Sequence, residues 1–496
     1  MSDKKRVAAG AGLVSLGRMI GSITNLVTMM VLTRLLDKAQ FSTMAFFYLL
    51  LGAITLFGAL GLPKALVYYL AKLDRSNSRA LSFWTGVCLL ALAVPIALVL
   101  EGGGALLEHF GGKPEFAVAL FYLGFTVLFE LPGKALPHCF LAQEKFRAWF
   151  GVQTAYFLLR FGLVVVPAAL GASVETLLSL LLVLGAARFF GFALYVVFGM
   201  KGSLRRQGWE IRKIFAYGVP LSVASGVNRL NREIDKGFVA WLCAPEVFAV
   251  YAVEAIQLPF VAGLASSVTV AMLPTLVRHF NKGEVDTFMD YVHGLIKKMA
   301  SLMMPLFFFL MLMADPVVRL LFSDSYAAAA LPFRIYLFIL PLRLGGFGPI
   351  IRAMGETRPQ MYATTATLLV ATALNYPLLK LMGIAGPAVS SMVGQAVGLY
   401  WMLYVIRNRL EISWAQVVPL RDLTKATAVA AVAVIPAAAA SFFLSSDGLK
   451  VGVGGGLYLT TYLVLAHRFG VISAADWSYV KRLLTFRFLK RRGYED

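Results

Sequence analysis

Long apolar runs separated by short polar turns repeat along the whole chain. A helix of about 20 apolar residues crosses a hydrocarbon core about 30 Å thick, so runs of this length can span a membrane. The pattern therefore predicts an all-α polytopic membrane protein with about 14 transmembrane helices. The fourteen predicted spans lie at residues 9–36, 41–71, 80–100, 116–141, 147–170, 174–199, 214–241, 246–277, 288–313, 326–352, 360–381, 384–406, 423–444 and 449–467.

Composition excludes several other classes of protein. The chain has 496 residues, 59% of them hydrophobic, with a mean hydropathy of +0.75, whereas soluble domains are roughly 45–50% apolar. Cys88, Cys139 and Cys243 stand alone in apolar segments, so neither a disulfide framework nor a zinc site is expected. The sequence contains no H-E-x-x-H and no phosphate-loop motif, and we expect no metal, no cofactor and no catalytic residues.

Positive charge is distributed unevenly between the two sets of loops. The net charge of +20 comes from 46 basic and 26 acidic residues. Loops on one side of the predicted membrane hold most of the Lys and Arg, including Lys4–Arg6, the segment 201–213 and the C-terminal tail. Because basic loops stay in the cytoplasm and fourteen is even, both termini are predicted to be cytoplasmic. This asymmetry accounts for most of the net charge, and the basic tail is predicted to lie on an anionic leaflet, so nucleic acid is not needed as a partner.

The long basic linker after the sixth span suggests two lobes. Six spans precede it, and six being even, both halves would enter the membrane from the same face as parallel repeats. Such halves usually enclose a central cavity. The predicted division is residues 1–200 for the N-terminal lobe (helices 1 to 6), 201–213 for the cytoplasmic linker, 214–407 for the C-terminal lobe (helices 7 to 12), 408–469 for helices 13 and 14, and 470–496 for a basic cytoplasmic tail.

Charged residues inside the spans are the most informative chemistry. An ionised side chain at the bilayer centre costs at least about 2.5–3.5 kcal/mol, so such residues need a wet cavity or partners. Cations outnumber anions ten to four, which predicts a cationic cavity that suits an anionic substrate. Because arginine binds phosphate through a planar fork, a diphosphate fits best. The cations are Arg18, Lys64, Lys134, Arg160, Arg188, Arg229, Arg232, Lys236, Arg334 and Arg343, and the anions are Glu130, Glu233, Asp235 and Glu254.

The cations divide into candidate ligand-binding residues and candidate structural ones. In the seventh span, helical spacing predicts the pairs Arg229 with Glu233 and Arg232 with Asp235. Either these pairs hold a polar helix between the two halves, or the arginines contact a ligand directly. Lys64 lies near a span end, where snorkelling is the alternative. The predicted substrate-binding residues are Arg18, Arg160, Arg188, Arg229, Arg232 and Lys64.

Embedded acids are candidates for a different role. Glu130 with Lys134 is predicted to be a structural i,i+4 bridge. Asp235 and Glu254 are instead the candidates for coupling transport to H⁺ or Na⁺, because of the depth of the first and the lack of a local partner for the second. Prolines such as Pro63 and Pro137 within the spans would free backbone carbonyls and permit bending.

Short motifs in a characteristic order add a resemblance to a known family. They are Leu16–Arg18, Leu32–Leu36, Gly61–Ala65, Asp235–Lys236, Tyr251–Ala252, Leu273–Leu276, Asp315–Phe322, Arg352–Thr357 and Gly383–Ala388. With these motifs the chain resembles the polysaccharide transporter (oligosaccharide flippase) family of the multidrug/oligosaccharidyl-lipid/polysaccharide exporter superfamily. The resemblance implies two six-helix lobes around a V-shaped cavity, with helices 13 and 14 packed outside.

The same resemblance implies a function. A polyprenyl-diphosphate-linked oligosaccharide of the polysaccharide or O-antigen type would cross a bacterial inner (plasma) membrane by alternating access, with its glycan in the cavity and its tail in the lipid bilayer. Polysaccharide polymerases and glycosyltransferases would be partners. Three alternatives remain: a lipid II flippase, a multidrug cation antiporter and a membrane enzyme. An antiporter for cations should have an acidic cavity, and an enzyme a larger extracytoplasmic loop than the longest one here, at 101–115.

Overall fold

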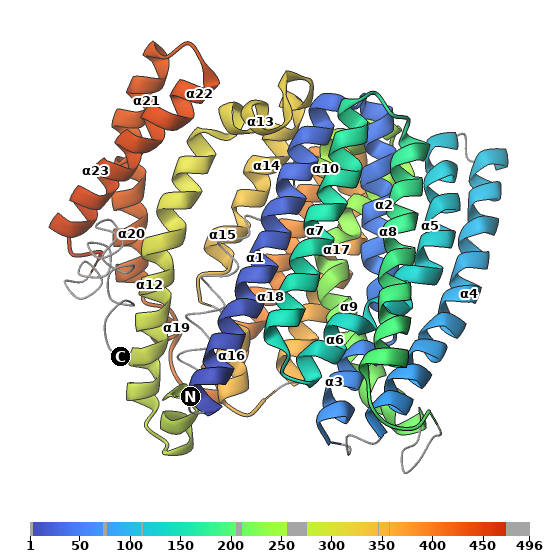
Figure 1. The fold of residues 1–496 in the computed structure, drawn as a ribbon. Helices are drawn as coiled ribbons and strands as arrows, with labels where there is room; N and C mark the ends of the chain where they lie inside the picture. The colour runs from blue at the N-terminus through green and yellow to red at the C-terminus, as the bar shows by residue number, and fades with distance from the viewer. Residues whose placement is uncertain are drawn as a thin grey trace, which may run out of the picture. The chain divides into compact units, whose positions relative to one another are not determined.

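Helices make up the fold throughout the computed structural model. It describes residues 3–72, 77–110, 113–204, 211–254, 275–345, 347–356 and 358–472, and no strand occurs among them (Figure 1). The chain divides into two compact units, Met1–Pro259 and Phe260–Asp496. Residues 473–496 of the basic tail, most of the eighth predicted span and residues 205–210 of the linker lie outside the described residues.

Long helices joined by tight turns form the first unit. α4 and α5 pack side by side, α8 lies against α5, and α2 contacts α5, α9 and α10. The helices are α1 (Asp3–Leu35), α2 (Lys38–Phe57), α3 (Leu62–Lys72), α4 (Ser78–Phe110), α5 (Pro114–Gly133), α6 (Ala135–Ala142), α7 (Phe146–Ala169), α8 (Val174–Leu194) with a π-helical end at Tyr195–Gly199, α9 (Ile211–Leu242) and α10 (Pro245–Glu254).

Shorter helices are more frequent in the second unit. A buried cluster rich in methionine joins α12 to α16, α18, α20 and α23. The helices are α12 (Val285–Leu312), α13 (Ala314–Phe322), a 3-10 helix (Asp324–Ala329), α14 (Ala330–Leu337), α15 (Ile339–Leu342), α16 (Phe347–Ala353), α17 (Arg358–Met382), α18 (Ala385–Leu410), α19 (Trp414–Val417), α20 (Leu420–Val432), α21 (Val434–Phe443), α22 (Asp447–Leu449), a π-helix (Lys450–Gly454) and α23 (Gly455–Arg468).

The all-α polytopic membrane architecture is confirmed. Within the described ranges, 12 stretches of helix are long and apolar enough to cross a membrane, so the count of about 14 is approximate. α9 corresponds to the seventh predicted span and is a continuous helix of 32 residues, but it carries more charge than an ordinary span. α9 and α10 pack in the first unit against α2, whereas the six plus six plus two division of lobes stays a prediction.

Several spans predicted as single helices are broken, and proline explains where. The span 41–71 ends as α2 at Phe57 and resumes as α3, and the span 116–141 divides between α5 and α6 at Lys134. Pro63 and Pro137 have no N–H to bond the carbonyl four residues earlier, and each break lies within that preceding turn. The span 326–352 likewise divides into several short helices. Hydropathy cannot detect these breaks because the residues on both sides are equally apolar.

Small residues let particular helices approach closely. On α1, Gly10, Gly17 and Gly21 lie against Phe146, Trp149 and Phe157 of α7, whose rings occupy the space where side chains would stand. In the second unit, Gly386, Gly394 and Gly398 bring α18 against the backbone of α17. Glycines at four-residue spacing are a common way to pack membrane helices, because no side chain separates the backbones.

Candidate anion-binding site

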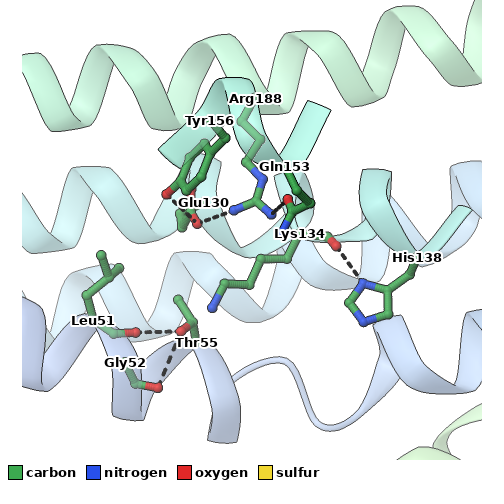
Figure 2. Close-up of polar contacts among 9 residues, drawn as sticks. All are labelled: Leu51, Gly52, Thr55, Glu130, Lys134, His138, Gln153, Tyr156 and Arg188. Carbon is green, nitrogen blue, oxygen red and sulfur yellow. Dashed lines mark hydrogen bonds and ion pairs between the residues drawn. The ribbon is translucent and has the colours of Figure 1, made fainter. Parts of the chain in front are cut away.

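A buried ion pair between α5 and α8 forms the centre of the candidate site. Arg188 Nη1 lies 2.6 Å from Glu130 Oε1, and their side chains are 9% and 5% exposed. The Tyr156 hydroxyl donates to the same carboxylate oxygen at 3.2 Å, and Arg188 Nη2 donates to Gln153 Oε1 at 3.4 Å (Figure 2). Gly133 of α5 permits this approach, since a Cβ there would lie 3.2 Å from Arg188 Cγ.

Tyrosine rings orient two of the guanidinium groups. The Arg188 guanidinium lies 4.4 Å from the centre of the Tyr156 ring, and that of Arg160 lies 4.3 Å from the centre of the Tyr48 ring. Because a guanidinium is planar, stacking on a ring fixes the plane in which its donors point. Tyr156 and Arg160 are both on α7, while Tyr48 belongs to α2.

Four cations in this region interact electrostatically. Lys134, at the junction of α5 and α6, lies within Coulombic range of Glu130, Arg160, Arg188 and Arg229. Figure 2 shows the Lys134 side chain extending towards the Leu51–Thr55 turn of α2. We call Lys134, Arg160, Arg188 and Arg229 the cation cluster. Its charge exceeds that of Glu130, so it favours an anion.

Arg229 joins the cluster from α9. Its guanidinium lies against Gly52 of α2, in the space that a side chain at Gly52 would fill. Its partner on α9 is Glu233, 3.5 Å away, which confirms the pairing predicted from helical spacing. Glu233 also faces Lys236 at 3.3 Å, so one carboxylate serves two cations. Arg229 Nε is buried and has no hydrogen-bond partner in the described structure.

Two predicted ion pairs are not formed among the described residues. Glu130 pairs with Arg188 of α8 instead of Lys134, because the Lys134 side chain turns towards α2. Asp235 does not pair with Arg232. It is fully buried and accepts hydrogen bonds from the Tyr251 hydroxyl at 3.0 Å and from the backbone N–H of Lys236 at 2.8 Å. Both predictions considered only residues in the same helix, whereas the partners that decide them lie on α8 and α10.

The remaining predicted site residues are placed separately. Arg232 is half-buried and interacts electrostatically with Arg229 and Glu233. Lys64 donates from Nζ to Ser225 Oγ at 2.6 Å, which ties α3 to α9. Arg18 is exposed on α1, and no described contact joins it to the cation cluster. The side chain of Glu254 lies outside the described residues.

Sequence reasoning did not select Lys134, Tyr48, Gln153 or Tyr156 as site residues. A signal for part of this set was present, because Gln153, Tyr156 and Arg160 follow a spacing of three and four residues and so share one face of α7. No sequence pattern indicates Tyr48, because its ring contacts the Arg160 guanidinium only when α2 and α7 pack together.

Lys113 caps the C-terminal end of α9. Its Nζ donates to the carbonyl oxygens of Ala240, Trp241 and Cys243 at 2.7 to 2.8 Å. These carbonyls have no partner within the helix, and a cation there also opposes the negative end of the helix dipole. Burial lowers the pKa of Lys113 from its usual range.

No group of three His, Cys, Asp or Glu side chains in the described ranges is arranged to hold a metal ion.

Comparison with known proteins identifies the family. The family described as polysaccharide biosynthesis protein matches residues 31–331, which is more than half of the chain. This chain belongs to that family. A curated relative, the probable lipid II flippase MurJ of Rhizobium meliloti (strain 1021), is 24% identical over 261 residues. That match covers 51% of this chain and 47% of MurJ, so the chain spans about half the length of the curated relative it matches.

Solved structures show the same fold in this member of the family. Lipid II flippase MurJ in an inward closed conformation superposes with a TM-score of 0.68 at 12% identity, covering 92% of this chain and 98% of MurJ. An inward-facing multidrug resistance MATE transporter of the MOP superfamily gives a TM-score of 0.60 at 17% identity, covering 81% and 98%. A MOP superfamily transporter from Pyrococcus furiosus, described as having a binding pocket of reversed polarity, gives 0.53 at 17% identity, covering 82% and 96%. The chain is therefore a multi-pass membrane protein with a MOP-type fold.

Proposed function

We propose that this protein is a flippase that moves a polyprenyl-diphosphate-linked oligosaccharide, a repeat unit of the polysaccharide or O-antigen type, from the cytoplasmic to the outer leaflet. The cation cluster carries the proposal, because four cations with only Glu130 and Glu233 as neighbouring carboxylates suit a ligand with several negative charges. Membership of the polysaccharide biosynthesis protein family supports it independently. The basic tail predicted at residues 470–496 and the N-terminus would then both be cytoplasmic, with the membrane being the bacterial inner membrane.

In this proposal, the protein binds and reorients its substrate without breaking a bond. Arg160, Arg188 and Arg229 offer guanidinium groups to the diphosphate, and Lys134 adds a point charge. The polyprenyl tail stays in lipid, and the glycan passes through the wet interior as the protein alternates between its two open states. Glycosyltransferases that build the glycan and a polymerase that consumes it would be the functional partners.

An embedded acid would couple this movement to H⁺ or Na⁺. Of the two candidates, Asp235 and Glu254, the structure describes the side chain of Asp235. Its carboxylate is buried and accepts a hydrogen bond from Tyr251 of α10. Protonation of Asp235, or binding of a cation to it, would therefore alter the contact between α9 and α10. The membrane potential is the other source of energy, worth about 2.3 kcal/mol per charge per 100 mV. Transport by Asp235→Asn under an imposed ion gradient distinguishes the two: loss of gradient dependence supports coupling through Asp235.

Lipid II is the second candidate substrate, because both MurJ comparisons point to it. It is also a polyprenyl diphosphate, so the cation cluster suits either lipid. A cationic drug suits the cluster poorly, since it would enter a region of like charge. An antiporter for cations is therefore the least supported of the transport functions.

Mass spectrometry of lipid extracts from cells with and without the protein tests the proposal. We expect a polyprenyl-diphosphate oligosaccharide to accumulate in the cytoplasmic leaflet when the protein is depleted. Accumulation of lipid II in its place would establish the second candidate. Unchanged lipid-linked glycans with increased sensitivity to cationic drugs would contradict both.

A further inference from the structure

Glu130 is the ion-pair partner of Arg188 in the cation cluster, whereas Arg229 pairs with Glu233. The Oε1 atom of Glu130 accepts from Arg188 at 2.6 Å and from Tyr156 at 3.2 Å. Glu130 also interacts electrostatically with Lys134 and with Arg160. The carboxylate is thus a counter-ion for at least three cations, which are Arg188 on α8, Arg160 on α7 and Lys134 at the junction of α5 and α6.

Arg188 is bound unequally on its two sides. Nη1 makes the short charged contact to Glu130, whereas Nη2 makes only a long contact of 3.4 Å to the neutral amide oxygen of Gln153. A diphosphate that approached Arg188 could displace the Gln153 amide at little cost. To engage the guanidinium through both nitrogens it would have to displace Glu130, because one edge cannot hold two anions at hydrogen-bonding distance.

Glu130 therefore acts on an anion in two ways. It occupies the stronger donor of Arg188, and its own charge repels a phosphate placed among the other cations. Both effects weaken binding. A transporter needs such a limit, because a ligand held by several unopposed cations would enter readily but leave too slowly to permit turnover.

We propose that Glu130 is an internal counter-ion that competes with the substrate diphosphate for Arg188 and so sets an affinity weak enough for release. The inference rests on the proposed function, since it assumes a diphosphate ligand. It differs from a purely structural role for the Glu130–Arg188 pair, which predicts that loss of Glu130 weakens binding because Arg188 is no longer held in place.

Binding of farnesyl diphosphate, a short polyprenyl diphosphate, to the purified full-length protein in lipid nanodiscs tests this inference. We expect Glu130→Gln to bind about tenfold more tightly than wild type, equivalent to about 1.4 kcal/mol, and to transport more slowly. Glu130→Asp keeps the charge but withdraws it from Arg188, so its affinity should lie between the two. The control is Glu175→Gln, which removes an exposed carboxylate from the first turn of α8 and should leave affinity unchanged.

Equal or weaker binding by Glu130→Gln, with wild type binding normally, would overturn the counter-ion role and leave the proposed function intact. Absence of binding by wild type would instead overturn the proposed function. If Glu130→Gln does not fold, Glu130→Asp decides: tighter binding than wild type supports competition, and unchanged or weaker binding contradicts it.

Discussion

The guanidinium of Arg160 lies 4.3 Å from the centre of the Tyr48 ring, which brings a cation of α7 onto an aromatic face of α2. Cation–π contacts are worth about 0.5–2 kcal/mol, more when they are shielded from water. The ring also fixes the guanidinium plane, which a lysine ammonium does not have. The contact therefore links the packing of two helices to the direction of the donors that Arg160 offers.

Arg160→Lys should bind farnesyl diphosphate about three- to thirtyfold more weakly than wild type, because the charge remains while the stacked fork is lost. Tyr48→Phe retains the ring and should bind normally, whereas Tyr48→Ala should resemble Arg160→Lys. Titration calorimetry on the purified protein measures these affinities. Normal binding by Tyr48→Ala would show that the ring does not orient Arg160.

Arg188→Ala should lower the free energy of unfolding by about 3–5 kcal/mol, since it removes the ion-pair partner of the buried Glu130 carboxylate. The double variant Glu130→Gln with Arg188→Gln should be more stable than Arg188→Ala, because both charges of the 2.6 Å ion pair are removed together. Thermal unfolding in detergent, followed by fluorescence, measures the difference. Equal instability of the two variants would mean that packing and not charge holds α5 against α8.

Gly52→Ala should weaken diphosphate binding with little effect on stability. The added Cβ would displace the Arg229 guanidinium, which is the flexible end of a side chain, so the backbone need not move. Gly162→Ala on α7 is the matched control, because nothing lies within 4 Å of its added Cβ. An affinity of Gly52→Ala equal to that of the control would place Arg229 outside the binding surface.

Lys113→Met should lower the free energy of unfolding by about 1–2 kcal/mol, because three carbonyls at the end of α9 lose their donor and the helix dipole loses its cation. Lys282→Met removes a largely exposed cation and should change stability by less than about 0.5 kcal/mol. Unfolding in detergent compares the two. A Lys113→Met protein as stable as wild type would show that water replaces the lysine at these carbonyls.

Local sequence predicted one of three ion pairs within a helix correctly. The Arg229–Glu233 pair follows from a spacing of four residues, and the structure has it. The Arg232–Asp235 and Glu130–Lys134 pairs followed from the same reasoning and are not formed in the described structure, because Tyr251 and Arg188 are nearer. Helical spacing shows which residues share a face of one helix. It does not show which residues of other helices pack against that face.

The sequence by itself determined that the protein is helical, crosses a membrane many times and carries an excess of positive charge within its spans. Each of these depends on the length or the composition of apolar runs. Bilayer thickness sets the length that a span needs, and the cost of desolvating a charge makes embedded cations stand out in the sequence. Only the tertiary structure decided that Glu130 meets Arg188 across 58 residues, that Tyr48 lies beneath Arg160, and where the helices break. These depend on the packing of helices distant in the chain, for which a single sequence carries no periodic signal.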